Sequence, residues 1–326
     1  MAKKYGKPHR YLYLTVMFWF ILASLFQTHF LIPHATAAEN TVIIIRSQQI
    51  TAYNEAIKGF EEGCKGKNIS IKAIYDLHGD TEEGKRIIQN IKDSRLKPRV
   101  ILAIGVLAAT LVKEQFPDIP IVFCMVINHD RFNLQGANIT GISSEASIED
   151  QFTIFKEILG KNKNVGVIYD PSKTGKIISE ATIAAKKFEF NLIKTEVLSE
   201  KEVASALKNI INKINALWMI PDSTVITKNT LSVIAKITLE HRLPIFCTSD
   251  AMVKAGALIS VSPNYAYTGL QAALIAQTLL NDPTKTSLGI KQPDKLKLTL
   301  NTQTAEIVGI NPSSIKYFPD VVLYPQ

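Results

Sequence analysis

Short apolar runs alternate along this chain with segments of helical period, and this alternation limits the possible folds more than any other feature of the sequence. A strand that is apolar throughout must be covered on both faces. Helices between successive strands provide that cover when the strands are parallel. The pattern therefore predicts an α/β fold with parallel sheets between layers of helices.

The alternation runs through two halves of the chain. In the first half we expect strands at 41–45, 69–75, 99–104 and 119–126, with helices at 51–62, from Thr81 onward and at 106–115. In the second half we expect helices at 147–159, 174–188 and 200–213, with strands at 164–169, 190–197, 216–220, 243–247 and 257–261. One continuous sheet is an improbable arrangement for so many strands, and two Rossmann-like lobes accommodate them.

Three extended segments are expected to pass between the lobes. Residues 138–143 are too short and too apolar for a flexible linker, and further passages fit at 260–264, before a helix at 265–281, and at 296–301, before a helix at 304–308. Several passages make a hinge that resists twisting yet opens and closes. We therefore predict lobe 1 as residues 38–140 plus 264–290, and lobe 2 as 141–263 plus 291–326.

The N-terminus has the features of an export signal. A basic head is followed by an apolar run at 11–26, about sixteen residues long, and then by Ala35-Thr36-Ala37. This order is typical of a secretory signal peptide, so residues 1–37 are predicted to be one, with cleavage after Ala37. The alternative is an uncleaved membrane anchor, because the apolar stretch can be extended to Ile32. No cysteine lies near the cut, which argues against a lipid anchor.

Charge and cysteine usage set further limits. Four of the 37 Lys and Arg lie in the basic head, which leaves 33 against 29 Asp and Glu, a net charge of +4 after cleavage. The basic residues are scattered rather than clustered, so nucleic-acid binding is disfavoured. Cys64, Cys124 and Cys247 lie within or beside apolar segments. Burial as three free thiols is favoured over one disulfide with a spare thiol.

Several motifs, taken in order, resemble the substrate-binding proteins of ABC transporters of the tryptophan/tyrosine-binding type. They lie at 100–105, 119–123, 136–143, 165–171, 243–246, 256–269 and 300–312. The resemblance implies a type I periplasmic-binding fold, no catalysis, a small-molecule ligand such as an amino acid, and a membrane permease as partner. One departure concerns the loop after the first strand, where relatives with aromatic amino-acid ligands carry His-Pro and this chain has SQQITAY at 47–53.

Candidate ligand contacts follow the apolar strands, because ligands of open α/β folds bind beyond the carboxyl ends of the strands. In lobe 1, backbone amides at such places suit a carboxylate. In lobe 2, carboxylates suit an ammonium group, and tyrosines at element ends suit an aromatic or sugar ring. The candidates are Ser47, Gln48, Tyr53, Gly105, Val106, Asn128, Tyr169, Asp170, Asp222, Thr224, Ser249, Asp250 and Tyr265.

Structural roles compete with each of these assignments. Gly105 could serve strand-to-helix packing, Asp170 could form a turn, Asp222 and Asp250 could cap helices, and the tyrosines could cover core. Asp222 resembles the ligand-side aspartate of the family best.

Catalytic signatures are missing from the sequence. It has no G-x-G-x-x-G or phosphate-binding loop after the first strand and no G-x-S-x-G motif, and the six histidines lack metal-ligand spacing. No cofactor or metal is expected, and His129-Asp130 is interpreted as a solvated loop. The sequence thus predicts a periplasmic, monomeric solute receptor. A sensor that docks on a signalling receptor, or an enzyme using Asp222 or His129, are the alternatives.

Overall fold

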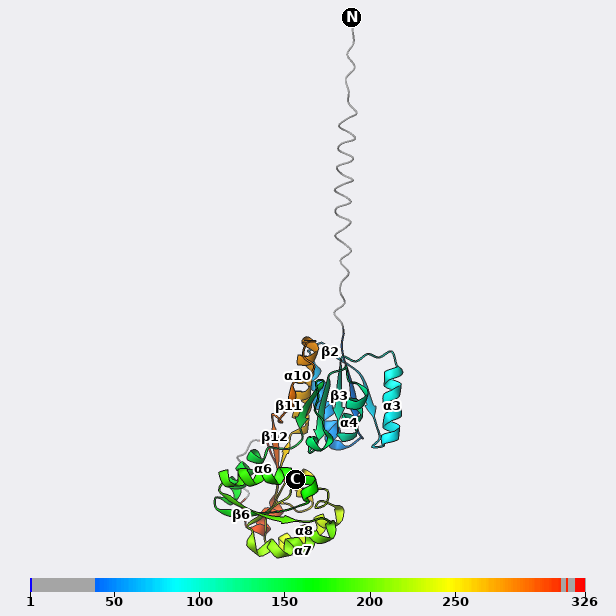
Figure 1. Ribbon diagram of the computed structural model, residues 1–326. Helices are drawn as coiled ribbons and strands as arrows, with labels where there is room; N and C mark the ends of the chain where they lie inside the picture. The colour runs from blue at the N-terminus through cyan, green and yellow to red at the C-terminus, as the bar shows by residue number, and fades with distance from the viewer. Residues whose placement is uncertain (2–38, 312–314, 316–319, 326) are drawn as a thin grey trace. The chain divides into compact units, whose positions relative to one another are not determined.

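The computed structural model describes Met1, residues 39–311, Ile315 and residues 320–325, and the described residues from Asn40 onward belong to one unit of the fold. The predicted signal peptide and its cleavage point lie outside the described residues. The unit contains two sheets with helices on both faces, which confirms the predicted α/β class (Figure 1).

The first sheet has the strand order β11-β5-β4-β3-β1-β2, and its strands all pair in parallel. Its strands are β1 (Asn40–Arg46), β2 (Ile69–Asp76), β3 (Val100–Ile104), β4 (Ile121–Val126), β5 (Ile139–Ser143) and β11 (Gly289–Lys291). The helices around it are α2 (Thr51–Cys64), α3 (Thr81–Asp93), α4 (Val106–Gln115) and α10 (Tyr265–Asn281).

Alternation of side chains explains why the central strands of this sheet, β1, β3 and β4, are largely apolar. Val42 and Ile44 of β1 pack with α2 and α10, whereas Ile43 and Ile45 pack with α3 and α4 on the opposite face. The same division by odd and even positions holds in β3 and in β4 up to Cys124, after which a register shift turns Met125 toward α2 and α10 and Val126 toward the other face. The central strands β1, β3 and β4 are therefore buried on both sides, as the sequence pattern predicts, whereas the edge strands β2 and β11 are partly exposed.

The second sheet has the order β13-β12-β10-β9-β8-β6-β7. Its strands are β6 (Lys163–Tyr169), β7 (Phe190–Glu196), β8 (Ala216–Trp218), β9 (Ile245–Cys247), β10 (Ile259–Pro263), β12 (Leu296–Asn301) and β13 (Val321–Tyr324). The helices are α5 (Ile148–Leu159), α6 (Pro171–Lys187), α7 (Glu200–Ile210), α8 (Lys228–Glu240), α9 (Asp250–Lys254) and α11 (Thr302–Val308). Strand β12 runs antiparallel to β10, and the other pairs are parallel.

The chain passes between the two sheets three times, at places close to those predicted. The three strands at these places, β5, β10 and β12, each belong to one sheet and do not themselves cross. The passages are the short segments beside them: residues 144–147 after β5, Asn264 after β10 and residues 292–295 before β12. Strands β5 and β11 span the predicted lobe boundaries at 140/141 and 290/291, and both belong entirely to the first sheet. The lobe boundaries otherwise stay a prediction.

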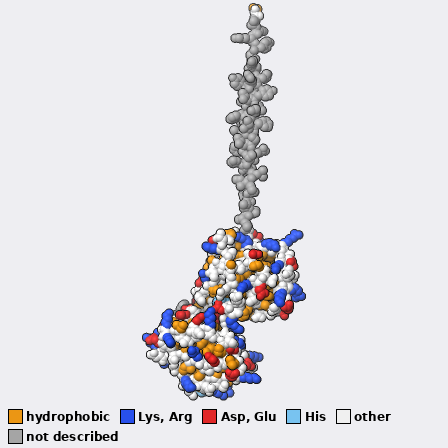
Figure 2. Space-filling view, in the orientation of Figure 1, with side chains coloured by type: hydrophobic (Ala, Val, Ile, Leu, Met, Phe, Trp, Pro, Cys, Tyr) orange, Lys and Arg blue, Asp and Glu red, His pale blue; other side chains and the backbone are white. Residues whose placement is uncertain are grey.

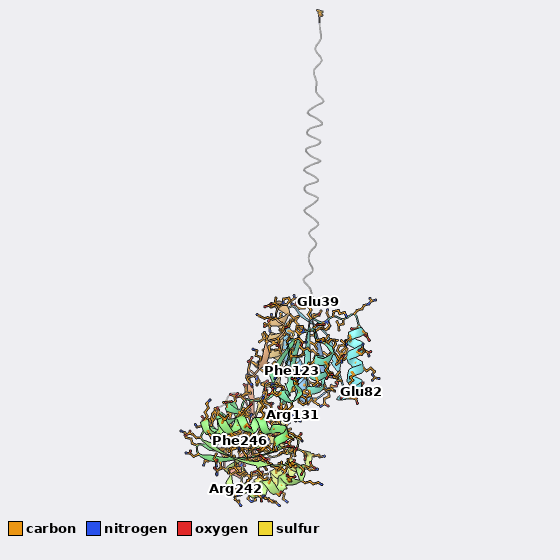
Figure 3. All side chains as sticks on the ribbon, in the orientation of Figure 1. Glu39, Glu82, Phe123, Arg131, Arg242 and Phe246 are labelled. Carbon is orange, nitrogen blue, oxygen red and sulfur yellow. The ribbon has the colours of Figure 1, made fainter. Side chains whose placement is uncertain are left out.

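The interiors of both lobes are tightly packed. Phe123 lies within the first sheet and Phe246 within the second, and both are fully buried (Figure 3). All three cysteines are buried free thiols, which confirms the burial prediction. Burial raises the pKa of Cys124 and Cys247 to about 12, so their thiols stay protonated at neutral pH.

Helices α2 and α10 approach closely because glycines line their contact. A Cβ added at Gly269 of α10 would lie 1.9 Å from the carbonyl oxygen of Ala56, and one added at Gly59 of α2 would lie 1.9 Å from that of Ala266. Neither distance is physically possible, so both positions need glycine. This packing ties α10, which the chain reaches only after crossing from the second sheet, onto the first lobe.

Gly269→Ala should therefore destabilise the protein, because the two helices must move apart to admit the methyl group. We expect a loss of about 2–3 kcal/mol in the free energy of unfolding, measured by urea denaturation. Gly175→Ala on α6 is the matched control, since its Cβ would have only Pro171 nearby, at 4.0 Å. That variant should gain up to about 1 kcal/mol from helix propensity. Equal midpoints for the two variants would contradict the packing argument.

Candidate functional site

The carboxyl ends of the parallel strands carry most of the predicted site residues. In the first lobe, Ser47 follows β1, Gly105 follows β3 and Asn128 follows β4. In the second lobe, Asp170 follows β6 and Ser249 follows β9. These loops form the edge of each sheet at which ligands bind in open α/β folds.

Ser47, Tyr53 and Gly105 come together at the start of α4. Gly105 has φ +86°, and a Cβ there would lie 2.5 Å from the Tyr53 hydroxyl oxygen and 2.6 Å from Ser47 Oγ. Because Gly105 has no side chain to cap the helix, Ser47 Oγ accepts from the amide of Ala108 at 3.0 Å and donates to the Ile104 carbonyl. Gln48 is exposed and Val106 is half-buried beside this cluster.

Asn128 joins the loop after β4 to the second lobe. It adopts a left-handed conformation with φ 50°, its Nδ2 donates to the Lys173 carbonyl at 3.3 Å, and its backbone amide donates to Glu145 at 3.1 Å. Asp130 in the same loop pairs with Lys176 of α6, and the hydrogen bond from Lys176 lowers the pKa of Asp130. The ion pair is largely exposed and contributes little stability.

His129 lies less open to solvent than the sequence suggested. Its side chain is 18 % exposed, and its Nδ1 is buried without a hydrogen-bond partner. The adjacent Asp130 is exposed, as expected of a solvated loop. Nearby, burial raises the pKa of Glu145, which accepts the Asn128 amide and lies close to Asp130.

A pocket of about 520 Å³ opens beside this loop. It is bounded by the loop after β4, the first crossing, α6 and the ends of β8 and β9, with Asn128, Glu145, Lys176, Pro221, Thr248 and Gln292 among its lining residues. Asn128 alone among the predicted site residues lines it. Sequence reasoning missed the others because they come from separate elements and follow no local motif.

Asp222 and Asp170 together fix the loops after β6 and β8. Asp222 is 1 % exposed, and its carboxylate accepts hydrogen bonds from the Asp170 amide at 2.8 Å, from Thr174 Oγ1 at 2.6 Å and from the amide of Thr224 at 2.9 Å. Thr224 Oγ1 in turn donates to Asp170 at 2.7 Å. The two carboxylates are thus held by neutral donors of the protein itself.

The structural roles predicted for these two aspartates differ in outcome. Asp170 caps α6 and accepts from Ser172, and these hydrogen bonds, with the one from Thr224, lower its pKa. Asp222 does not cap the following helix, because Thr227 caps α8 and Asp222 closes a turn instead. Ligand contact by Asp170, Asp222 and Thr224 stays a prediction.

Tyr169 packs into the core rather than over the strand end. It is buried among the side chains beneath α5 and α6, and its hydroxyl donates to Glu196 at 2.8 Å. Burial and this hydrogen bond raise its pKa to about 12. The position favours the core-covering role that the sequence left open for this residue.

Asp250 and Tyr265 both lie close to Lys297 of β12, beside the second and third passages. Asp250 pairs with Lys297 and accepts from Thr299 at 2.9 Å and Ser260 at 3.2 Å. Burial acts to raise the pKa of Asp250, but the hydrogen bond and charge of Lys297 outweigh it and leave that pKa lowered. The preceding Ser249 is the N-cap residue of α9 but makes no side-chain capping bond.

Tyr265 approaches the same pair from the start of α10. The Lys297 ammonium lies 5.6 Å from the centroid of its ring. Burial, with Asp250 and Glu55 nearby, raises the pKa of the Tyr265 hydroxyl to about 12. Lys297 was not predicted as a site residue, because no local sequence pattern distinguishes it from the lysines at 291 and 295.

Charges of both signs are interspersed over the face that Figure 2 shows, without a basic stripe. Within residues 39–311, 315 and 320–325, no helix is long and apolar enough to cross a membrane. In the same part of the chain, no group of three or more His, Cys, Asp or Glu is arranged to hold a metal ion.

Comparison with known proteins places this fold in a family. Residues 42–316 match the family described as ABC transporter substrate binding protein. A tyrosine-binding protein of Clostridioides difficile is 23 % identical over 271 residues, which are 80 % of this chain and 76 % of that relative.

Solved structures share the architecture over most of the chain. A ligand-free, open substrate binding protein with adhesive properties from Clostridium difficile has a TM-score of 0.74 at 20 % identity, covering 87 % of this chain and 98 % of that one. An ABC domain from Streptococcus pneumonia in complex with L-Trp has a TM-score of 0.63 at 18 % identity, covering 87 % and 100 %. At these identities the likeness establishes the fold.

Asp222→Ala tests how much the hydrogen bonds of Asp222 contribute to the stability of the fold. The truncation leaves the Asp170 amide and Thr174 Oγ1 without their acceptor in a buried place, so we expect a loss of about 3 kcal/mol in the free energy of unfolding. Asp222→Asn keeps one acceptor oxygen and should lose less. Chemical denaturation of both variants measures the difference, and a wild-type midpoint for the alanine variant would refute the role.

Proposed function

Since this chain belongs to the family of ABC transporter substrate-binding proteins, we propose that it is the solute receptor of an importer and holds a small polar molecule between its two lobes. Members of this family are in general not enzymes. They work outside the cytoplasmic membrane and hand a small molecule to the transporter's permease, which makes that permease the expected partner of this chain.

The observation that carries the proposal is the paired arrangement of strand ends. In both sheets the carboxyl ends of the parallel strands lead into loops that carry polar side chains, and three passages connect the sheets. The contacts from Asn128 and Asp130 to Lys173 and Lys176 bring the two sets of loops into reach of each other. A cleft between these two sets of loops suits a ligand that makes some of its contacts with each lobe.

An amino acid is the ligand class that the relatives favour. One relative is described as tyrosine-binding, and a protein of the same fold was solved with L-Trp. Tyr53, Gly105, Asn128 and Tyr265 on the first lobe and Thr224 and Asp250 on the second provide the polar and aromatic groups that an amino acid needs. We propose these as ligand contacts, with Ser47 and Asp222 holding the walls in place.

Export and assembly complete the proposal. The basic head, apolar run and Ala35-Thr36-Ala37 support cleavage after Ala37 and a periplasmic mature protein. No cysteine near the cut offers a lipid attachment site. The mature chain would act as a monomer that closes on its ligand, with the closed form recognised by the permease.

Isothermal titration of the purified protein tests this function directly. We expect one binding site for at least one of the twenty standard amino acids, with L-tyrosine and L-tryptophan tried first and ribose, glucose and purines as comparison ligands. Binding should also raise the thermal midpoint, because a ligand that prefers the folded state stabilises it. No heat and no thermal shift from any of these solutes would refute the receptor assignment.

A further inference from the structure

The hinge strands present a polar face that the fold itself does not require. Strands β10 and β12 pair antiparallel, with Ser260 opposite Thr299 and Ser262 opposite Lys297. Directly opposed residues point to the same side of a sheet, so the four side chains share one face. Ser260, Thr299 and Lys297 all reach Asp250, which confirms their common direction.

Two full charges of opposite sign stand on this face, partly shielded but open to approach. The side chains of Lys297 and Asp250 are 20 % and 30 % exposed. Tyr265 covers the pair from the start of α10, which packs on the first lobe. The cluster therefore lies where residues of both lobes meet, and Asp250 and Lys297 both keep part of their side-chain surface open to solvent.

Ser262 provides an independent sign that the cluster is incomplete. Its residue is fully buried and its Oγ has no hydrogen-bond partner, although it lies directly opposite Lys297. A buried hydroxyl without a partner costs free energy and is uncommon in folded proteins. A ligand atom that accepts a hydrogen bond beside Lys297 would satisfy it.

We infer that Asp250, Lys297 and Ser262 form the subsite for the charged main-chain groups of an α-amino acid. The ligand's ammonium binds the Asp250 carboxylate, its carboxylate binds the Lys297 ammonium and the Ser262 hydroxyl, and the Tyr265 ring covers them from the other lobe. This inference rests on the proposed receptor function and adds to it the residues that select a zwitterion.

Charge matching explains why this ligand class fits best. A zwitterion offers each member of the ion pair an opposite charge, so both stay paired when the ligand enters between them. A neutral sugar between Asp250 and Lys297 would separate the two charges and offer neither of them an opposite charge in return. A dicarboxylate without an ammonium would set a negative charge against Asp250, which the low pKa of Asp250 keeps ionised.

The test crosses two variants with two trimmed ligands. Asp250→Asn keeps the shape of the side chain and removes its charge, and Lys297→Met keeps its length. The ligands are L-tyrosine, desaminotyrosine, which lacks the ammonium, and L-tyrosinamide, which lacks the carboxylate. If another standard amino acid binds more tightly, its own desamino acid and amide take their place.

We expect each variant to bind the intact amino acid about 10- to 100-fold more weakly. Asp250→Asn should bind the desamino acid as tightly as the wild type does, because this ligand has no ammonium for Asp250 to bind. Lys297→Met should likewise bind the amide as tightly as the wild type does, because the amide has no carboxylate for Lys297 to bind. Lys295→Met is the matched control. Lys295 also lies over a tyrosine ring, 4.6 Å from the centroid of Tyr267, and pairs with Asp320 instead. It should bind within twofold of the wild type.

The other outcomes separate this inference from the proposed function. Equal losses for intact and trimmed ligands would show that the pair braces the hinge, and would overturn the subsite. Binding of a sugar but of no amino acid would overturn the subsite while leaving the receptor function intact. Thermal melts of the variants test whether they are folded, which separates a loss of binding from a loss of structure.

Discussion

Three chain passages hold the two sheets together, and the positions of all other functional parts depend on them. Ala146 of the first passage, Val261 of β10 and Leu298 of β12 share one apolar cluster, so the first passage packs against the two strands that adjoin the second and third. The antiparallel pairing of β10 with β12, continued by the hydrogen bond from Asn264 to Lys295, joins the second and third. A connection of this kind allows bending about one axis and resists twisting.

This constraint explains how the polar residues divide their tasks. Ser47 and Asp222 use their hydrogen-bonding atoms to fix loops of the wall, which leaves little for a ligand. Asn128, Asp250 and Tyr265 lie where the lobes meet or beside the passages. A residue that follows a strand end can therefore be either support or contact, and its partners decide which.

The sequence predicted the fold well because burial on both faces leaves a local trace. Helix α10 and strand β12 have the predicted bounds, and most other elements agree within a few residues. The short strands β11 and β13 were missed because they lie at the edges of the two sheets, where burial is only partial, and their pairing is set by distant segments. The same reason applies to the site. The surroundings of Lys297, Glu145 and Ser262 are formed by residues far away in the chain, so no local pattern marks them.

The proposed function requires that the two lobes close on a ligand by bending about these passages. Small-angle X-ray scattering of the purified protein, with and without a saturating amino acid identified by titration, measures this directly. The account predicts a smaller radius of gyration in the bound state and a return to the original profile after dialysis. Superimposable profiles at full occupancy would contradict hinge closure, however tightly the ligand bound.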